Sequence, residues 1–109
     1  MRWVEVCALE DILPDTGVCA LIDGRQVAVF RLAGSDEVFA IDNYDPNSGA
    51  NVLSRGIVGD LGGQLVVASP VYKQHFNLAT GVCLEDPTAS VRAYPACVVD
   101  GHVRVGIGD

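Results

Sequence analysis

The feature that most limits the possible folds of this chain is the close spacing of its turn-forming residues. Gly, Pro and Asp recur along all 109 residues and separate short apolar runs that are rich in Val and Ile. Nowhere do apolar residues keep the i, i+3, i+4 spacing of an amphipathic helix over a dozen positions. Many short strands with a turn after each predict an all-β sandwich or small barrel.

The expected strands contain β-branched or aromatic residues and end at turn residues. Their ranges are 3–7, 18–22, 26–32, 37–42, 57–60, 64–68, 76–78, 82–84, 91–94, 97–99 and 102–107. Asp23-Gly24 and Asp100-Gly101 are strong hairpin signals. Apolar residues alternate along 26–32, so at least one face of this strand should be buried while Arg31 reaches solvent. Pro14 allows no more than a helical turn before it.

Composition and charge exclude several classes of function. We expect residues 1–109 to form a single domain, because the chain is long enough for a modest core and has no linker. The net charge is −7 and the seven basic residues are scattered, which argues against nucleic-acid binding. No uncharged run is long enough to span a membrane, and the first residues lack the apolar segment of a signal peptide. We therefore expect a cytoplasmic protein with neither a membrane nor a nucleic acid as partner.

The four cysteines are compatible with disulfides, a zinc site or reduced thiols. No two of them form a C-x-x-C motif, and a cytoplasmic chain keeps its thiols reduced. Cys7, Cys19 and Cys97 lie in apolar, strand-like runs, where Cys packs as a small hydrophobic residue. We therefore expect core packing, with a metal or redox role as the alternative.

Two loops that follow predicted strands carry the most distinctive motifs. The first reads N-Y-D-P-N-S-G-A over residues 43–50, and the second reads S-P-V-Y-K-Q-H-F-N-L-A-T-G over residues 69–81. Together they resemble the paired loops of Rieske iron–sulfur proteins, N-x-C-P-H-x-G-A followed by C-P-x-H-x-x-x-F-x-L-x-T-G. This resemblance implies a Rieske-like antiparallel β fold in which the two loops are adjacent in space.

All four positions that hold the cluster in Rieske proteins are substituted in this chain. The resemblance places the two cysteine ligands at Asp45 and Ser69 and the two histidine ligands at Asn47 and Tyr72. A Rieske centre needs thiolates and imidazoles, whereas carboxylate, amide, hydroxyl and phenol are hard oxygen donors. We therefore expect no cluster, no metal and no other cofactor here. The four side chains should instead bond one another or the loop backbone, since buried polar groups need partners.

Over nearly its whole length the chain resembles the small subunit of the cytoplasmic NAD(P)H-dependent nitrite reductase, a Rieske-like family without cluster ligands. The blocks that carry this resemblance are 3–9, 14–21, 43–46, 48–50, 52–60, 68–70, 72–76 and 83–86. It implies a part in reducing nitrite to ammonium during nitrate assimilation. It also implies a large partner subunit that carries siroheme, an iron–sulfur cluster and FAD and that uses NAD(P)H. This chain would then contain no catalytic residue and be inactive alone.

The second loop is also the expected docking surface for the large subunit. In Rieske proteins electron-transfer partners dock at the cluster end, and here that end carries Tyr72, Lys73, Gln74 and His75, which include the only lysine. A phenol and a cation on an exposed loop are residue types that anchor interfaces. The alternative is that Tyr72 covers the core and Lys73 is merely solvated. His75 is also compatible with a purely structural role.

Other features of the sequence suggest functions besides the subunit role. A free-standing Rieske-like interaction domain without an enzymatic partner stays open, whereas the four substitutions argue against a working Rieske ferredoxin. Asp45, Asn47 and Gly49 echo part of a calcium loop, but the bidentate Glu is missing. Ser69, His75 and Asp45 form a Ser-His-Asp set without a nucleophile elbow. His102 alternates with apolar residues, which predicts a position on the solvated face of a strand.

Overall fold

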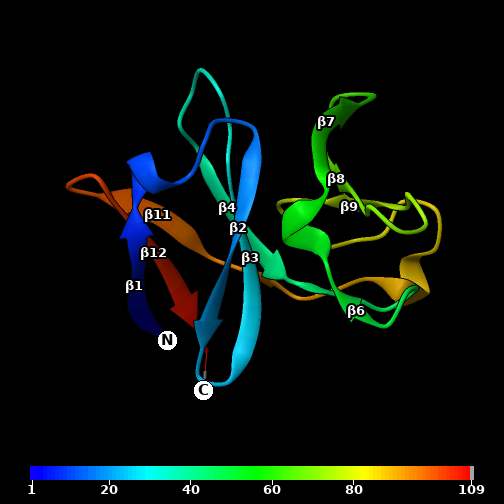
Figure 1. Ribbon diagram of the computed structural model, residues 1–109, viewed down its shortest axis with the longest axis horizontal. Coiled ribbons are helices and arrows are strands. Elements are labelled where there is room, and N and C mark those ends of the chain that lie inside the picture. The colour runs from blue at the N-terminus through cyan, green and yellow to red at the C-terminus, as the bar shows by residue number, and fades with distance from the viewer. Residues whose placement is uncertain (109) are drawn as a thin grey trace.

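The computed structural model describes residues 1–108 and consists mainly of β-strands (Figure 1). The strands are β1 Arg2–Ala8, β2 Thr16–Ile22, β3 Arg25–Arg31, β4 Val38–Asp42, β5 Tyr44–Asp45, β6 Ala50–Asn51, β7 Ile57–Leu61, β8 Gln64–Ala68, β9 His75–Asn77, β10 Ala93–Tyr94, β11 Ala96–Val99 and β12 His102–Ile107. Three single-turn 3-10 helices complete the chain: η1 Leu9–Asp11, η2 Leu53–Arg55 and η3 Pro87–Ala89. The predicted all-β class is confirmed. No helix within residues 1–108 is long and apolar enough to cross a membrane.

The strands form an antiparallel arrangement in three layers. An outer sheet has the order β1-β12-β11, a central sheet has the order β10-β4-β3-β2, and a loop sheet has the order β7-β8-β9. The short hairpin β5-β6 follows β4 directly. In Figure 1 the outer sheet lies to the left, the central sheet in the middle, and the loop sheet and β6 to the right. The two loops of interest therefore lie on the side of the central sheet away from the two termini.

Strand β3 shows how one strand holds the layers together. Val27 and Val29 belong to a first core between the outer and central sheets, and Ala28 and Phe30 belong to a second core that includes residues of the loop sheet. None of these four side chains is exposed. Successive side chains of a strand point to opposite faces, so both faces of β3 are covered. The expectation of at least one buried face is confirmed.

Arg31 is a correction to the sequence-based prediction. Its side chain is only 18% exposed, and it forms an ion pair with Asp36. Its Nη1 also donates to the carbonyl of Ile12 at 2.9 Å. The segment from η1 to β2 folds over the end of β3, so the arginine is covered where the alternation pattern predicted solvent. A guanidinium group with five donors can satisfy such a site.

The cysteines give a second correction. All four are free thiols, and Cys83 is fully buried while Cys7 and Cys97 are half-buried. Cys19 is exposed, which contradicts the expected core packing. It lies on β2, an edge strand of the central sheet, where its thiol donates to Gln26 Oε1 at 3.5 Å. An edge strand has fewer neighbours to cover it, so apolar surroundings in the sequence did not produce burial.

Two predicted strand boundaries also differ from the structure. Residues 82–84 form only an isolated bridge between Cys83 and Phe76, because the chain turns into η3 shortly afterwards. Strand β2 begins at Thr16, which pairs with Arg31, so the first hairpin is longer than expected. Asp15, at φ 60°, lies in the turn that leads into β2, which the N–H of Thr16 closes onto the Leu13 carbonyl at 3.2 Å.

Candidate functional site

The two loops meet at a hydrogen bond between Asp45 and Ser69. The Ser69 hydroxyl donates to Asp45 Oδ2 at 2.5 Å, and the side chains are 1% and 0% exposed, respectively. Asp45 lies in β5 of the first hairpin, and Ser69 follows β8 in the loop sheet. The expectation that the loops are adjacent is therefore confirmed. A hydroxyl bonded to a carboxylate is among the stronger hydrogen bonds of proteins.

Each partner is held in place by its own loop. The other carboxylate oxygen of Asp45 accepts the backbone N–H of Asn47 at 2.9 Å, and its carbonyl accepts the N–H of Gly49 at 2.8 Å. Ser69 donates its N–H to the Gln74 carbonyl at 2.9 Å and accepts the N–H of Lys73 at 3.0 Å. Since both loops are closed by backbone bonds, the Asp45–Ser69 pair joins two turns that are already formed.

The remaining two degenerate positions do not join this pair. The side-chain nitrogen of Asn47 is buried without a hydrogen-bond partner among residues 1–108, although its backbone N–H is bonded. The Tyr72 side chain is 62% exposed. The expectation that the side chains at these four positions bond one another or the loop backbone is therefore wrong for Asn47 and Tyr72 among the described residues. The turn is completed by Lys73 in the left-handed conformation, at φ 63°, and its N–H donates to the Ser69 carbonyl.

The donor set at these four positions does not fit a 2Fe-2S cluster. Asp45 and Ser69 bond each other, Tyr72 faces solvent, and none of the four offers a thiolate or an imidazole. The buried Cys83 lies beyond the second loop, with its sulfur 4.0 Å from Glu85 Oε1. In the part of the chain that the structure describes, no three His, Cys, Asp or Glu side chains are grouped as metal ligands. No electron-transfer step is therefore assigned to these loops.

His75 is held by Glu85 across the base of the second loop. The His75 backbone N–H donates to Glu85 Oε1 at 2.7 Å, and the ring Nδ1 lies 2.6 Å from Oε2. Gln74 is half-buried, and its Oε1 has no partner among the described residues. Of the four predicted docking residues, Tyr72 and Lys73 project into solvent, while Gln74 and His75 are partly covered. Their role in docking stays a prediction.

The Glu85 carboxylate provides a testable pH dependence. The hydrogen bond from the His75 backbone is the main cause that lowers the pKa of Glu85 from its ordinary value of 4.5. A carboxylate with a lowered pKa stabilises the fold above its unfolded-state pKa and loses this contribution as pH falls through its folded-state pKa. We expect the wild type to be more stable than Glu85→Gln at neutral pH and to lose this advantage below pH 4.5.

Urea midpoints of both proteins, measured between about pH 7 and about pH 3, check this prediction. Glu37→Gln serves as the control, because Glu37 is exposed and its carboxylate has no hydrogen bond within residues 1–108. If the difference in urea midpoint between the wild type and Glu85→Gln stays constant over the whole pH range, the stabilising role assigned to the Glu85 carboxylate is wrong.

A hollow of about 410 Å³ lies directly beside Ser69. Its lining includes Arg55, Ile57, Pro70, Lys73 and His75. The Ile57 side chain is 76% exposed, and neither Arg55 nor Lys73 takes part in the ion pairs found within residues 1–108. An apolar hollow with two cations at its rim is an unusual surface for a chain with a net charge of −7.

Arg55 and Ile57 were not predicted as site residues. Ile57 pairs with Ala68, the residue before Ser69, so the strand after η2 runs beside the second loop. Gly56 permits this approach, because a Cβ at that position would lie 2.3 Å from the Ala68 carbonyl oxygen. A single glycine in the sequence gives no hint of which strand it contacts.

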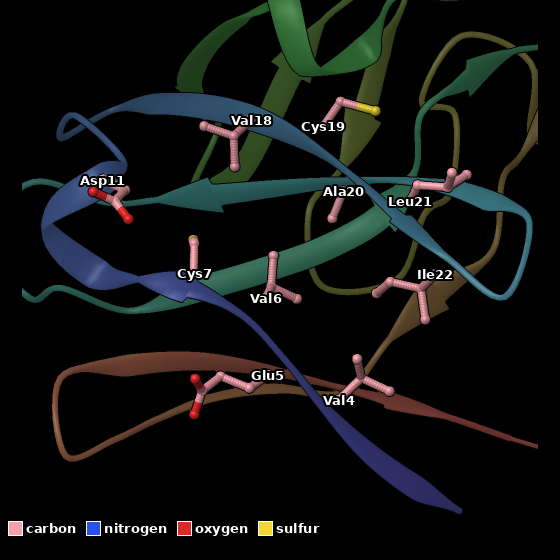
Figure 2. Close-up of a pocket in the computed structure, with 10 residues that line it drawn as sticks. All are labelled: Val4, Glu5, Val6, Cys7, Asp11, Val18, Cys19, Ala20, Leu21 and Ile22. Atoms are coloured by element: carbon pink, nitrogen blue, oxygen red, sulfur yellow. The ribbon is translucent and has the colours of Figure 1, made fainter.

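A second hollow, of about 280 Å³, lies between the edge strands β1 and β2 (Figure 2). Figure 2 shows aliphatic side chains of both strands around it, with Glu5, Asp11 and Cys7 also on its lining. Burial, followed by the charge of Asp11, raises the pKa of the Cys7 thiol. A thiol with a raised pKa is a poor nucleophile at neutral pH. Ser69 and His75 both line the hollow of about 410 Å³, but the Ser69 hydroxyl donates to Asp45 and the His75 ring is paired with Glu85. No Ser69–His75 hydrogen bond forms within residues 1–108, so the Ser-His-Asp set is not connected as a triad.

Comparison with known proteins gives consistent matches over almost the whole chain. Residues 2–106 match the family described as the Rieske-like [2Fe-2S] domain. The nitrite reductase (NADH) small subunit of Salmonella typhimurium is 53% identical over 104 residues, which cover 95% of this chain and 96% of that protein. The solution structure of the Escherichia coli protein NirD superposes with a TM-score of 0.91 at 50% identity, covering 99% of this chain and 98% of that one.

One further relative has a different length. The nitrite reductase [NAD(P)H] large subunit of Klebsiella oxytoca is 44% identical over 104 residues, and these cover 95% of this chain but 11% of that protein. The fold, the two joined loops and the high identity over full length lead to one conclusion. The chain belongs to the family of nitrite reductase small subunits, within the Rieske-like domains.

Proposed function

We propose that this chain is the small subunit of a cytoplasmic NAD(P)H-dependent nitrite reductase and that it acts by docking on the large subunit. The large subunit reduces nitrite to ammonium in nitrate assimilation. It carries siroheme, an iron–sulfur cluster and FAD, and it takes electrons from NAD(P)H. The small subunit holds no redox centre and is inactive alone.

One observation carries this proposal. The Klebsiella oxytoca large subunit contains a stretch that matches 95% of this chain at 44% identity. In that protein a domain like this one is covalently attached to the rest of the reductase. A domain that is fused to an enzyme in one organism and separate in another is expected to contact that enzyme in both. In the fused form the covalent link keeps the domain at a high effective concentration beside the enzyme.

The docking surface that we propose is the tip patch, defined as Arg55, Ile57, Tyr72 and Lys73. All four residues are exposed, and they lie on or beside the loops that the Asp45–Ser69 bond holds together. Tyrosine and arginine are enriched at the energetic centres of interfaces. The patch is basic and partly apolar, so it suits a partner surface with carboxylates around an apolar centre.

The direct test is reconstitution with the native large subunit. We expect the tagged chain to copurify with that subunit and to show no NAD(P)H-dependent nitrite reduction by itself. Nitrite-dependent NADH oxidation should require the large subunit. A chain that does not associate with the large subunit under these conditions would favour the alternative, a free-standing interaction domain. An absorbance spectrum with a visible iron–sulfur band would instead favour a ferredoxin.

Substitutions in the tip patch test the docking surface itself. Tyr72→Ala is expected to weaken binding to the large subunit by about thirtyfold, because a central tyrosine contributes about 2 kcal/mol. Lys73→Glu should weaken it as well, and more strongly at low salt. Titration of the large subunit at two salt concentrations measures both effects.

Two variants outside the tip patch serve as controls. Leu21→Ala removes an apolar side chain that is 74% exposed on β2, and Arg104→Glu makes a charge change of the same size on β12. Both should bind like the wild type. If Tyr72→Ala and Lys73→Glu remain folded and bind as well as the two controls, the tip patch is not the docking surface.

A further inference from the structure

A third pocket, of about 380 Å³, lies where the central sheet meets the first hairpin. Arg25 at the start of β3, Asp42 at the end of β4, Tyr44 in β5, and Arg92 and Tyr94 at β10 contribute to its lining. It shares no lining residue with the hollow beside Ser69. The nitrite reductase resemblance assigns no role to these residues.

Two guanidinium groups flank Tyr94 in this pocket. The Cζ of Arg92 lies 5.5 Å from the centre of the Tyr94 ring. The pKa of Tyr94 is raised, first by burial and then by its hydrogen bond to Asp42, and the guanidinium group of Arg25 acts in the opposite direction. Arg25 lines the same pocket as the Tyr94 ring that Arg92 covers.

Asp42 is the one carboxylate among the described lining residues, and it does not neutralise both cations. Asp42 Oδ1 accepts the Tyr94 hydroxyl at 2.5 Å, and Oδ2 accepts the Arg92 backbone N–H at 3.2 Å. Neither Arg25 nor Arg92 takes part in the ion pairs found within residues 1–108. Counted over the lining residues that the structure describes, two guanidinium groups and one carboxylate give a net charge of +1, in a chain whose net charge is −7.

The pocket is also rich in hydrogen-bond donors. The Gln26 side chain, on its lining, uses Oε1 to accept from Asn43 Nδ2 at 3.1 Å and from the Cys19 thiol at 3.5 Å. This leaves the Gln26 nitrogen as a donor beside the guanidinium groups, and a guanidinium group has donors only. Carboxylates and phosphates both complement several donors and a positive charge, and the carboxylate is the one that unmodified protein side chains supply.

We propose that the Arg25–Arg92 pocket binds a carboxylate side chain of the large subunit and forms a second contact besides the tip patch. The inference rests on the proposed function, because it needs that partner. Two arginines beside tyrosines are the residue types that dominate binding energy in interfaces. The net charge of the chain repels a free anion at long range, whereas a carboxylate on a docked partner is presented at high effective concentration.

The test compares Arg25→Gln and Arg92→Gln with the wild type in binding the native large subunit. Each variant should weaken binding by about tenfold or more, because each leaves a partner carboxylate with fewer charged donors. The salt dependence of binding should also decrease in both. Arg104→Gln, with the same charge change on β12, should bind like the wild type. Thermal unfolding of the isolated variants checks that they are folded.

The outcomes separate this inference from the proposed function. If the wild type binds and both variants bind equally well, the pocket inference is overturned while the proposed function stands. If the wild type does not bind the large subunit at all, both are overturned. Titration of this chain with sodium acetate, followed by NMR, tests whether the pocket is instead a site for free anions. Saturable acetate binding that both variants lose, together with unchanged binding to the large subunit, would identify a site for free anions and overturn the inference.

Discussion

Gly81→Ala is expected to lower the free energy of unfolding by about 4 kcal/mol, among the largest effects of any single substitution in this chain. Gly81 has φ 78°, and a Cβ at this position would lie 2.1 Å from the Val91 carbonyl oxygen. Its N–H donates to the Asn77 carbonyl at 2.7 Å, and its own carbonyl accepts the Val91 N–H at 2.9 Å. The backbone cannot move away from Val91 without losing these bonds. Urea unfolding followed by circular dichroism measures the loss.

Gly101→Ala is the matched control for this prediction. Gly101 has φ 76°, almost the same as Gly81, but an added Cβ would meet nothing within 4 Å. The backbone strain of an alanine is therefore similar at the two positions, but the steric conflict is absent at Gly101. The free energy of unfolding of Gly101→Ala should fall by about 1 kcal/mol. Equal losses in the two variants would show that strain alone, and not the contact with Val91, determines the effect.

The parts of the fold that the sequence predicted well depend on local turn chemistry. In both Asp-Gly hairpins the two central residues adopt positive φ, with 50° and 79° at Asp23 and Gly24 and 51° and 76° at Asp100 and Gly101. Few residue pairs tolerate this geometry, so the sequence alone located the β2–β3 and β11–β12 turns. Because each of these turns is short, the two strands that it connects pair with each other as a hairpin.

The errors concern burial, which depends on contacts between distant segments. Arg31 was expected in solvent because the alternation of a strand says nothing about a 3-10 turn that folds over its end. Cys19 was expected in the core because an apolar run does not reveal that its strand lies at the edge of a sheet. In both cases the deciding neighbours come from the packing of layers.

The candidate site shows the same division. The adjacency of the loops and the pairing of Asp45 with Ser69 agree with expectations drawn from the Rieske resemblance. No clear signal in the sequence predicts the left-handed conformation of Lys73, the residue after the exposed Tyr72, because this conformation is uncommon for a residue with a side chain. The hollow beside Ser69 and the Arg25–Arg92 pocket are each lined by residues from separate segments of the chain, and no local motif predicts them.

Asp45→Ala is the substitution that tests whether a protein hydrogen bond has taken over the structural role of a cluster. It removes the acceptor of both the Ser69 hydroxyl and the Asn47 N–H. We expect the free energy of unfolding to fall by about 3 kcal/mol. Hydrogen bonds to a charged group contribute about 1.5–3 kcal/mol each, and buried donors without partners are costly. Asp60→Ala is the control: Asp60 is exposed, and within residues 1–108 its side chain accepts only the Gly63 N–H. The free energy of unfolding should therefore fall by less than about 1 kcal/mol.

A double-mutant cycle with Ser69→Ala separates the bond between the loops from the other effects of Asp45. If the Asp45–Ser69 bond joins the loops, the free energy of unfolding of the double variant should fall by less than the sum of the decreases in the two single variants. The expected difference is about 1–2 kcal/mol. Additive losses would mean that each loop is stable by itself and that the bond contributes nothing to their association. A substantial coupling would mean that two oxygen-bearing side chains now hold together the loops that a metal cluster joins in Rieske proteins. The docking surface beside Ser69 then depends on this pair for its shape, so Asp45→Ala should also weaken binding to the large subunit.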